Sequence, residues 1–403
     1  MKRVLFVTWD GPQVTYLEGL FVPIFARLRD HGFEFAVLQF TYGERSRSDQ
    51  ARTACEAAGI PYRRVDIWRA GAAGAFVTSA LGGRHVDRAV REWRIDMLMP
   101  RSLLPGLAVL RSRSKRRLPI IFDADGLPAD ERVEFSGLNS RGAVYQILRR
   151  IEAEAVRWAR TVLVRTEATI PILADRASVS PDKFHVVTNG RDTAPFMSIR
   201  FAAPGSASPR LCYLGSIGPQ YLPEHMFALA AEIRSRFPDT TLNVFTSDRG
   251  AAEAALSALG LIGQDWISIQ SLHPDEVPQA VSACDIGFAL RQDSFSMQAV
   301  APVKIGDYLL AGVPIIGSGE VGPVAEALRS GCMMRADRPI GELLSWVGAV
   351  LEQRETWRRR CRDLGVRQFS VDHSVEQYRD ALEAANLPGD LSRKPVGNRT
   401  TPR

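Results

Sequence analysis

Two short segments, far apart in the chain, open in the same way. Residues 3–12 (RVLFVTWDGP) and residues 210–219 (RLCYLGSIGP) each run from an apolar stretch into a Gly-Pro turn and then into a helix-favouring sequence. A short apolar run of this kind predicts a buried strand. A strand, a tight turn and a helix in that order open a doubly wound α/β unit, whose ligands bind at the carboxyl ends of the strands. We therefore expect two such units, each with its own parallel sheet.

Strands and helices alternate after each opening, as parallel sheets require. After the first opening, helices are predicted near 17–29 and 50–58, and strands at 34–40, 95–99, 120–123, 162–165 and 185–188. After the second, strands are predicted at 241–246, 267–270 and 286–290. The fold class predicted from this order is α/β, with two Rossmann-like domains.

Turn-forming residues place the boundaries of these domains. The first domain is expected at 1–195 and the second at 209–372, joined by a linker at 193–208 that runs into AAPGSASP (202–209). A helix at 373–387 follows the last predicted strand, and we expect it to pack back toward the first domain. The polar tail at 388–403 is predicted to be disordered.

One stretch of the second domain, PVKIGDYLLAGVPII (302–316), indicates a binding site. Lys304 and Asp307 are three residues apart, so on a helix they share a face. Gly312 is a typical C-terminal stop for that helix, and 313–316 reads as a buried strand. A cation and a carboxylate at a helix N-terminus suit a ligand that carries both phosphate and hydroxyl groups. The alternative is a Lys–Asp pair on the surface of an ordinary helix.

Composition excludes several other classes of protein. Hydrophobic residues make up 45% of the 403 residues and charged residues 24%, as in soluble globular proteins. The five cysteines lack the spacing of a disulfide framework, and neither they nor the six histidines have the spacing of a metal site, so we expect no metal and a cytoplasmic location. The basic residues lack the interleaved aromatics of a nucleic-acid site, so no nucleic-acid partner is expected.

The charge is unevenly distributed. Residues 1–195 carry 30 Lys and Arg against 22 Asp and Glu, whereas residues 196–387 carry 17 against 22. The basic cluster RSRSKRR (111–117) is either a solvated loop or a patch attracted to an anionic membrane. The uncharged segment AGAAGAFVTSALGG (70–83) is too short to span a bilayer. It suits a mobile loop on the acceptor side or a shallow contact with a membrane.

Several motifs, in order along the chain, give it a family resemblance. They are FDADGLPADE (122–131), the helix and strand at 151–164, VVTNGRD (186–192), ACDIGFAL (283–290), the 302–316 stretch and the region 369–378. Together they resemble the retaining glycosyltransferases of family four over roughly residues 2–386. The resemblance implies the GT-B fold, in which two Rossmann-like domains face each other across a cleft.

The resemblance also implies roles for individual residues. Lys304 would neutralise the leaving diphosphate, and Asp307 would bind the ribose hydroxyls. Because the family's basic pair is missing after the second opening, the remaining diphosphate contacts are expected from the N–H groups and hydroxyl of Gly215 and Ser216, and from Arg291. On the first domain, the segment 122–131 resembles the one where the family often places an active-site His or Arg. Asp125 follows the predicted strand 120–123 there, and we expect it to contact the transferred sugar or the acceptor hydroxyl; alternatively it only caps its turn. Asp10 and Gly11 would lie on the acceptor side.

Two departures from the family pattern stand beside these matches. Many members have a Glu eight positions before the carboxylate represented here by Asp307, and this chain has Ala299 there. The segment after the second opening, 215–224, contains no basic residue, although members commonly have an Arg and a Lys there.

The resulting prediction is a retaining, metal-independent glycosyltransferase that needs no cofactor. Its donor would be a UDP or GDP sugar, and its acceptor a glycan or a lipid-linked glycan in surface polysaccharide biosynthesis. It would work at the inner face of the membrane as a peripheral protein. The alternatives are a weak or inactive nucleotide-sugar-binding partner of another transferase, and a sugar-nucleotide epimerase on the same fold.

Overall fold

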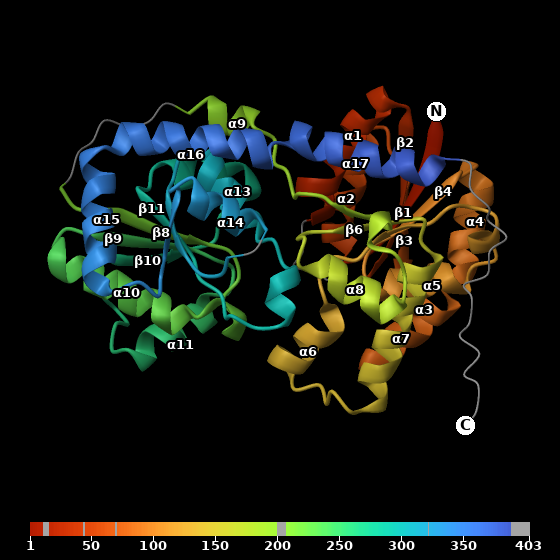
Figure 1. The fold of residues 1–403 in the computed structure, drawn as a ribbon, viewed down its shortest axis with the longest axis horizontal. Coiled ribbons are helices and arrows are strands. Elements are labelled where there is room, and N and C mark those ends of the chain that lie inside the picture. The colour runs from red at the N-terminus through yellow and green to blue at the C-terminus, as the bar shows by residue number, and fades with distance from the viewer. Residues whose placement is uncertain (11–15, 43–44, 69–70, 200–206, 321, 388–403) are drawn as a thin grey trace. The chain divides into compact units, whose positions relative to one another are not determined.

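The computed structural model describes residues 1–10, 16–42, 45–68, 71–199, 207–320 and 322–387. The chain divides into two compact units (Figure 1). Unit 1 comprises Met1–Val187 with the segment that begins at Val375, and unit 2 comprises Thr188–Ser374. The sequence had placed the first boundary at 195, a few residues later. Part of the predicted linker and the whole predicted disordered tail lie outside the described residues.

Unit 1 contains a parallel sheet whose strands follow the order β3-β2-β1-β4 and continue through bridges from β4 to β5-β6-β7. The strands are β1 (Lys2–Asp10), β2 (Phe33–Thr41), β3 (Tyr62–Asp66), β4 (Met97–Pro100), β5 (Ile121–Asp123), β6 (Thr161–Val164) and β7 (Phe184–Val186). The helices and helical turns are η1 (Leu17–Phe21), α1 (Val22–Leu28), η2 (Arg29–His31), α2 (Arg45–Ala57), α3 (Gly71–Leu81), α4 (Gly83–Trp93), α5 (Leu103–Arg111), η3 (Ser114–Arg116), α6 (Pro128–Ser136), α7 (Ala143–Trp158), α8 (Thr169–Ala177) and η4 (Pro181–Lys183).

Unit 2 has a six-stranded parallel sheet in the order β10-β9-β8-β11-β12-β13, the strand order of a doubly wound nucleotide-binding fold. Its strands are β8 (Arg210–Leu214), β9 (Thr241–Phe245), β10 (Ile267–Gln270), β11 (Ile286–Ala289), β12 (Ile315–Gly317) and β13 (Met333–Arg335). Its helices and helical turns are α9 (Ala194–Met197), η5 (Pro219–Tyr221), α10 (Pro223–Arg236), α11 (Arg249–Ala258), η6 (Pro274–Glu276), α12 (Val277–Ser282), η7 (Ser296–Ala299), α13 (Val303–Leu310), α14 (Pro323–Arg329), α15 (Ile340–Glu352) and α16 (Arg354–Phe369).

Helices cover both faces of the sheet of unit 2. One hydrophobic cluster joins the sheet to α10, α11 and α15, and another joins it to α12, α13, α14 and α16. The prediction of two doubly wound α/β domains is thereby confirmed. The last helix, α17 (Val371–Asn386), packs on unit 1, where the Arg160 guanidinium donates to the Ala385 carbonyl at 3.2 Å.

The sequence reading missed two edge strands, β3 and β13. β3 has the sequence YRRVD, and its two arginines and one aspartate hide the apolar signal of a strand. Charged side chains are common on edge strands because they discourage pairing with other chains. Central strands carry the stronger pattern because both of their faces are buried.

Candidate functional site

Helix α13 is fixed beneath the point where the strand order of unit 2 reverses, between β8 and β11. The hydroxyl of Tyr308 accepts a hydrogen bond from the Leu214 amide at 2.8 Å and donates to the Phe288 carbonyl at 3.0 Å. One side chain therefore joins the carboxyl ends of both strands to the helix. At the other end, Gly312 adopts φ +74°, and Val313 N–H closes the helix on the Tyr308 carbonyl, so the predicted stop is present.

One turn before Tyr308, Lys304 extends into an aromatic box at this reversal point. Its Nζ lies 3.9 Å from the centre of the Tyr213 ring and 4.7 Å from that of Tyr221. The nitrogen is buried and has no hydrogen-bond partner among the described residues. Cation–π contacts offset only part of the lost hydration, and burial lowers the pKa of the Lys304 ammonium to about 7. The arrangement presents a buried amine that can pair with an anionic group of a ligand.

Lysine is rare among the basic residues of this chain. Of 51 basic residues only five are lysines, and Lys304 is the single lysine within residues 188–374. An arginine is larger, is forked and stays charged in proteins, whereas a buried lysine can lose its proton. The box therefore suits the compact ammonium of lysine, whose charged form is favoured when a negatively charged ligand binds.

Gly215 gives Lys304 its space. It has φ +121°, and a Cβ at this position would lie 3.3 Å from both Cε and Nζ of Lys304. The expectation that the Gly215 amide binds phosphate needs correction, because that N–H donates to the Phe245 carbonyl at 2.9 Å as an extension of the sheet. Ser216 follows with an exposed side chain at the same turn.

Asp307 is buried, with 3% of its surface exposed. Its Oδ1 accepts from Nε of Arg191 at 2.7 Å. Arg191 is itself fixed through its backbone, which pairs with Phe369 and Val371. Asp307 therefore does not serve as an exposed complement to the helix dipole. It pairs with a partly exposed arginine, and Arg191 was not among the predicted site residues.

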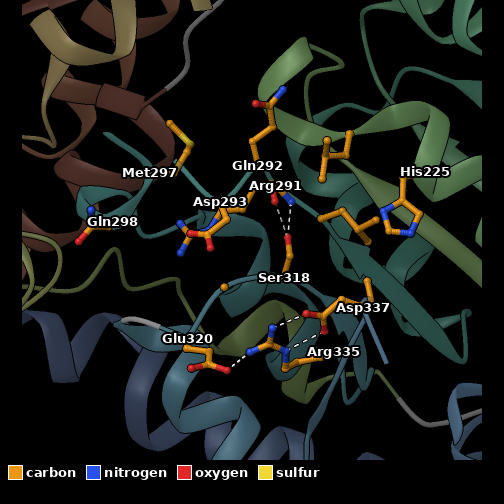
Figure 2. A pocket seen from close by; sticks show the side chains of 14 residues that line it. His225, Arg291, Gln292, Asp293, Met297, Gln298, Ser318, Glu320, Arg335 and Asp337 are labelled. Atoms are coloured by element: carbon orange, nitrogen blue, oxygen red, sulfur yellow. Dashed lines mark hydrogen bonds and ion pairs between the residues drawn. The ribbon is translucent and has the colours of Figure 1, made fainter. Parts of the chain in front are cut away.

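A polar cavity of about 600 Å³ lies at the carboxyl ends of β11, β12 and β13 (Figure 2). The turn η5 connects it to the lysine box, since Tyr221 covers Lys304 and the next residue, Leu222, lines the cavity. Hydrogen-bonding side chains surround it: His225, Arg291, Gln292, Asp293, Gln298, Ser318, Glu320, Arg335 and Asp337. Such a lining suits a ligand with several hydroxyl groups.

Arg291 lines this cavity but also supports its wall. The residue is 4% exposed, and its Nη1 donates to the Val300 carbonyl at 2.6 Å. Ser318 Oγ accepts from the Arg291 amide and donates to the Arg291 carbonyl, which ties the ends of β11 and β12 together. Ala299 is fully buried, so the position of the missing family carboxylate is part of the core in this chain. Asp293 is the exposed carboxylate of the same loop and lines the cavity.

The candidate residues of unit 1 belong to a cluster of charges at the carboxyl ends of β1, β4 and β5. Arg101 is 8% exposed and lies among three carboxylates. Its guanidinium is 2.6 Å from Asp125 and 3.9 Å from both Asp10 and Asp123. Asp123 is also held by Arg165, whose Nη2 donates to both carboxylate oxygens at 2.9 and 2.7 Å.

Within this cluster the carboxylates differ in accessibility. The side chain of Asp125 is 28% exposed, against 5% for Asp10 and none for Asp123. Burial raises the pKa of the Asp10 carboxyl, although Arg101 acts in the opposite direction. Asp125 has φ +52°, a left-handed conformation that Asp tolerates better than most residues. Asp125 is thus the group that a ligand can reach, while Gly11 lies outside the described residues.

Sequence reasoning did not select Arg101 or Arg165. The usable signal was positional, because both arginines directly follow a strand of a parallel sheet, where ligand-binding groups gather. The structure also changes the interpretation of the basic cluster 111–117. Lys115 donates to the Leu110 carbonyl and lies 4.7 Å from the centre of the Trp158 ring, so it is not a free surface charge. Arg113, Arg116 and Arg117 are exposed.

Two further features of the described residues concern metals and membranes. They contain no group of three or more His, Cys, Asp or Glu side chains placed to hold a metal ion. None of their helices combines the length and hydrophobicity needed to cross a bilayer.

Comparisons with known proteins agree with this architecture. Residues 22–190 match the model of the glycosyl transferase 4-like domain. No curated protein matches the chain in sequence. HepE of Anabaena in complex with UDP-glucose is similar in structure, with a TM-score of 0.67 at 15% identity over 95% of this chain and all of that chain.

Two other solved structures are similar at comparable coverage. Sucrose-phosphate synthase from Thermosynechococcus elongatus has a TM-score of 0.68 at 12% identity, over 95% of this chain and 100% of that chain. UDP-GlcNAc 2-epimerase from Neisseria meningitidis has a TM-score of 0.57 at 13% identity, over 94% of this chain and 99% of that chain. Residues 22–190 thus match a glycosyl transferase 4-like domain, and the chain as a whole shares the fold of these solved structures.

Proposed function

We propose that the protein transfers a sugar, with retention of anomeric configuration, from a UDP or GDP sugar to a glycan or lipid-linked acceptor in surface polysaccharide assembly. The observation that carries this proposal is the buried ammonium of Lys304 at the strand reversal of unit 2, which has no hydrogen-bond partner in the part of the chain that the structure describes. In the proposed complex, the diphosphate of a nucleotide sugar pairs with this ammonium. HepE, a protein of similar fold, was crystallised with UDP-glucose.

In this proposal, different side chains of unit 2 bind different parts of the donor. Transfer breaks the bond between the sugar and the diphosphate, and Lys304 stabilises the charge that develops on the leaving group. Asp307 accepts hydrogen bonds from the ribose hydroxyls, as acidic groups do in other nucleotide folds. The cavity lined by Gln292, Asp293 and Gln298 holds the sugar. None of these steps requires a metal or a cofactor.

Unit 1 supplies the acceptor side. Asp125 is accessible and is oriented by Arg101 at 2.6 Å, so it can accept a hydrogen bond from an acceptor hydroxyl or help to remove its proton. The exposed Arg113, Arg116 and Arg117 add a positive surface suited to an anionic membrane at the inner face.

Release of nucleoside diphosphate tests the proposed activity. UDP-glucose and GDP-mannose would first be screened for thermal stabilisation of the protein, since a ligand that binds the native state raises its stability. Slow release of the nucleoside diphosphate from a stabilising donor, lost in Lys304→Ala, is expected of a transferase. Binding without any turnover would favour the inactive-partner alternative. Conversion of UDP-GlcNAc into its 2-epimer would favour an epimerase.

Donor affinity is expected to depend on pH through Lys304. Its pKa in the free protein is about 7, so the ammonium is present below pH 7 and lost above it. Binding of UDP-glucose should therefore weaken as the pH rises, approaching about tenfold per unit well above 7. Titration calorimetry in buffers of different ionisation enthalpy should show proton uptake at pH 8, since the bound diphosphate favours the charged amine. In Lys304→Met the uptake should disappear; uptake that persists would place the titrating group elsewhere.

Asp307→Asn is expected to lower donor affinity about tenfold, because a neutral amide is a weaker acceptor for ribose hydroxyls than a carboxylate. Discrimination against a 2′-deoxy donor should decrease in parallel. Both are measured by competition binding at fixed pH. Since the change also weakens the pair with Arg191, Arg191→Gln is the matched control. That variant should lose stability while keeping the ribose discrimination, and equal loss in both variants would reduce Asp307 to a structural role.

A further inference from the structure

An apolar groove of about 760 Å³ lies on unit 1. Helix α5 packs against both α3 and α7, so these two helices stand on either side of it. The groove is lined by Phe76 and Val77 of α3, Leu104 of α5, and Val144 and Ile147 of α7. Arg132 and Ser136 of α6 complete its rim.

The groove leaves large aliphatic side chains in contact with solvent. Val77 is 39% exposed, Ile147 42% and Val144 58%. The sequence of α3, GAAGAFVTSAL, contains no charged residue that would keep it hydrated. A contiguous concave apolar surface of this kind commonly marks a binding site.

Arg132 carries the single charged side chain among the residues that line the groove. It lies on α6, which begins at Pro128, directly after the segment that contains Asp125. At about 1.5 Å per residue, the helix axis advances roughly 6 Å from Pro128 to Arg132. Glu131, its neighbour on α6, has a pKa raised first by burial and then by the charge of Asp125. Arg132 therefore lies in the first turns of the helix that directly follows the Asp125 segment.

We propose that this groove binds the hydrocarbon chain of the acceptor lipid, while the Arg132 guanidinium pairs with the phosphate that joins lipid to sugar. In this arrangement the hydrocarbon chain lies between α3 and α7, whose side chains line the groove. This inference deepens the proposed function and rests on it. Part of the segment for which the sequence allowed a mobile acceptor-side loop or a membrane contact is helical in the structure, and Ala73, Ala75, Phe76 and Val77 of α3 then supply one wall of a lipid site.

The size of the groove favours a lipid chain over a protein partner. Twelve residues line it, whereas a stable protein interface uses roughly 20–30 residues on each side. Its volume falls within the roughly 300–1,000 Å³ of small-molecule sites. The arginine at the rim adds a charge that matches a phosphate monoester or diester.

Binding of dodecyl phosphate, below its micelle concentration and measured by calorimetry, tests the assignment. Ile147→Glu and Val77→Glu should each weaken binding about tenfold or more. Each removes an aliphatic contact with the hydrocarbon chain and adds a charge that repels the phosphate. The matched control is Ile262→Glu, at a position that is 54% exposed in unit 2. It should bind as the unaltered protein does. Arg132→Gln should weaken dodecyl phosphate about tenfold and leave dodecanol binding unchanged.

The remaining outcomes also decide the question. Failure of the unaltered protein to bind dodecyl phosphate, or binding that ignores both groove substitutions, would overturn the assignment. A dimer that Ile147→Glu converts to monomers would show that a second copy covers the groove, and would equally overturn it. Stabilisation by UDP-glucose is measured on the same variants. If UDP-glucose does not stabilise the unaltered protein, the proposed donor chemistry is rejected. That result would not bear on lipid binding.

Discussion

Lys304→Ala is expected to lower the rate of sugar transfer by about a hundred- to a thousandfold, comparable to the loss of one oxyanion-type donor. Nζ is buried against the rings of Tyr213 and Tyr221 without a hydrogen-bond partner among the described residues, so no network within the protein depends on it. Removal of a desolvated cation should leave the fold intact or make it slightly more stable. The measurement is kcat for nucleoside diphosphate release, with thermal unfolding as the check on folding.

Lys183→Met is the matched control for this result. Lys183 is the other lysine with a markedly lowered pKa, to about 8 through burial, and its Nζ donates to the Val156 carbonyl of unit 1. Its replacement should leave the rate unchanged. Lys304→Arg should also lose activity, because the larger guanidinium does not fit beside Gly215, where a Cβ alone would lie 3.3 Å from Nζ. Full activity in Lys304→Ala would exclude this residue from the reaction.

The second large effect concerns stability. Arg165→Leu should destabilise unit 1 by about 3–5 kcal/mol, because it leaves the fully buried Asp123 carboxylate without its close partner. Hydrogen exchange of β5 and β6 reports the free energy of opening for these strands. Desolvation already raises the pKa of Asp123, and loss of Arg165 raises it further. Folding of the variant then takes up a proton, so its deficit should shrink as the pH falls.

Two companion variants separate the ion pair from a general effect of substitution. Replacement of both residues, Arg165→Leu with Asp123→Leu, should recover part of the lost stability, since no unpaired charge stays buried. Arg379→Leu breaks a solvent-exposed ion pair with Asp380, whose side chains are 34% and 60% exposed, and should change the stability very little. A loss of similar size in Arg165→Leu and Arg379→Leu would contradict the importance assigned to the buried pair.

Local sequence patterns could predict the helix that carries Lys304 and Asp307, because its apolar periodicity, the glycine stop and the following strand lie within fifteen residues (302–316). They could not reveal its surroundings. The aromatic box combines Tyr213, Tyr221 and Lys304, and the partner of Asp307 is Arg191, far away in the chain. Such contacts depend on which strands become neighbours, and single-chain periodicity does not encode that.

The sequence by itself determined that this protein has two doubly wound α/β units, because buried central strands and turn residues leave a local signal along the chain. It also predicted a ligand-binding site in the segment 302–316 of the second unit. Only the tertiary structure decided which side chains share a site. It united Asp10, Asp123 and Asp125 around Arg101, engaged the Gly215 amide in the sheet, and made side chains of the uncharged helix α3 one wall of a groove. Burial and charge pairing depend on residues far apart in sequence, and the fold alone brings them within a few ångströms.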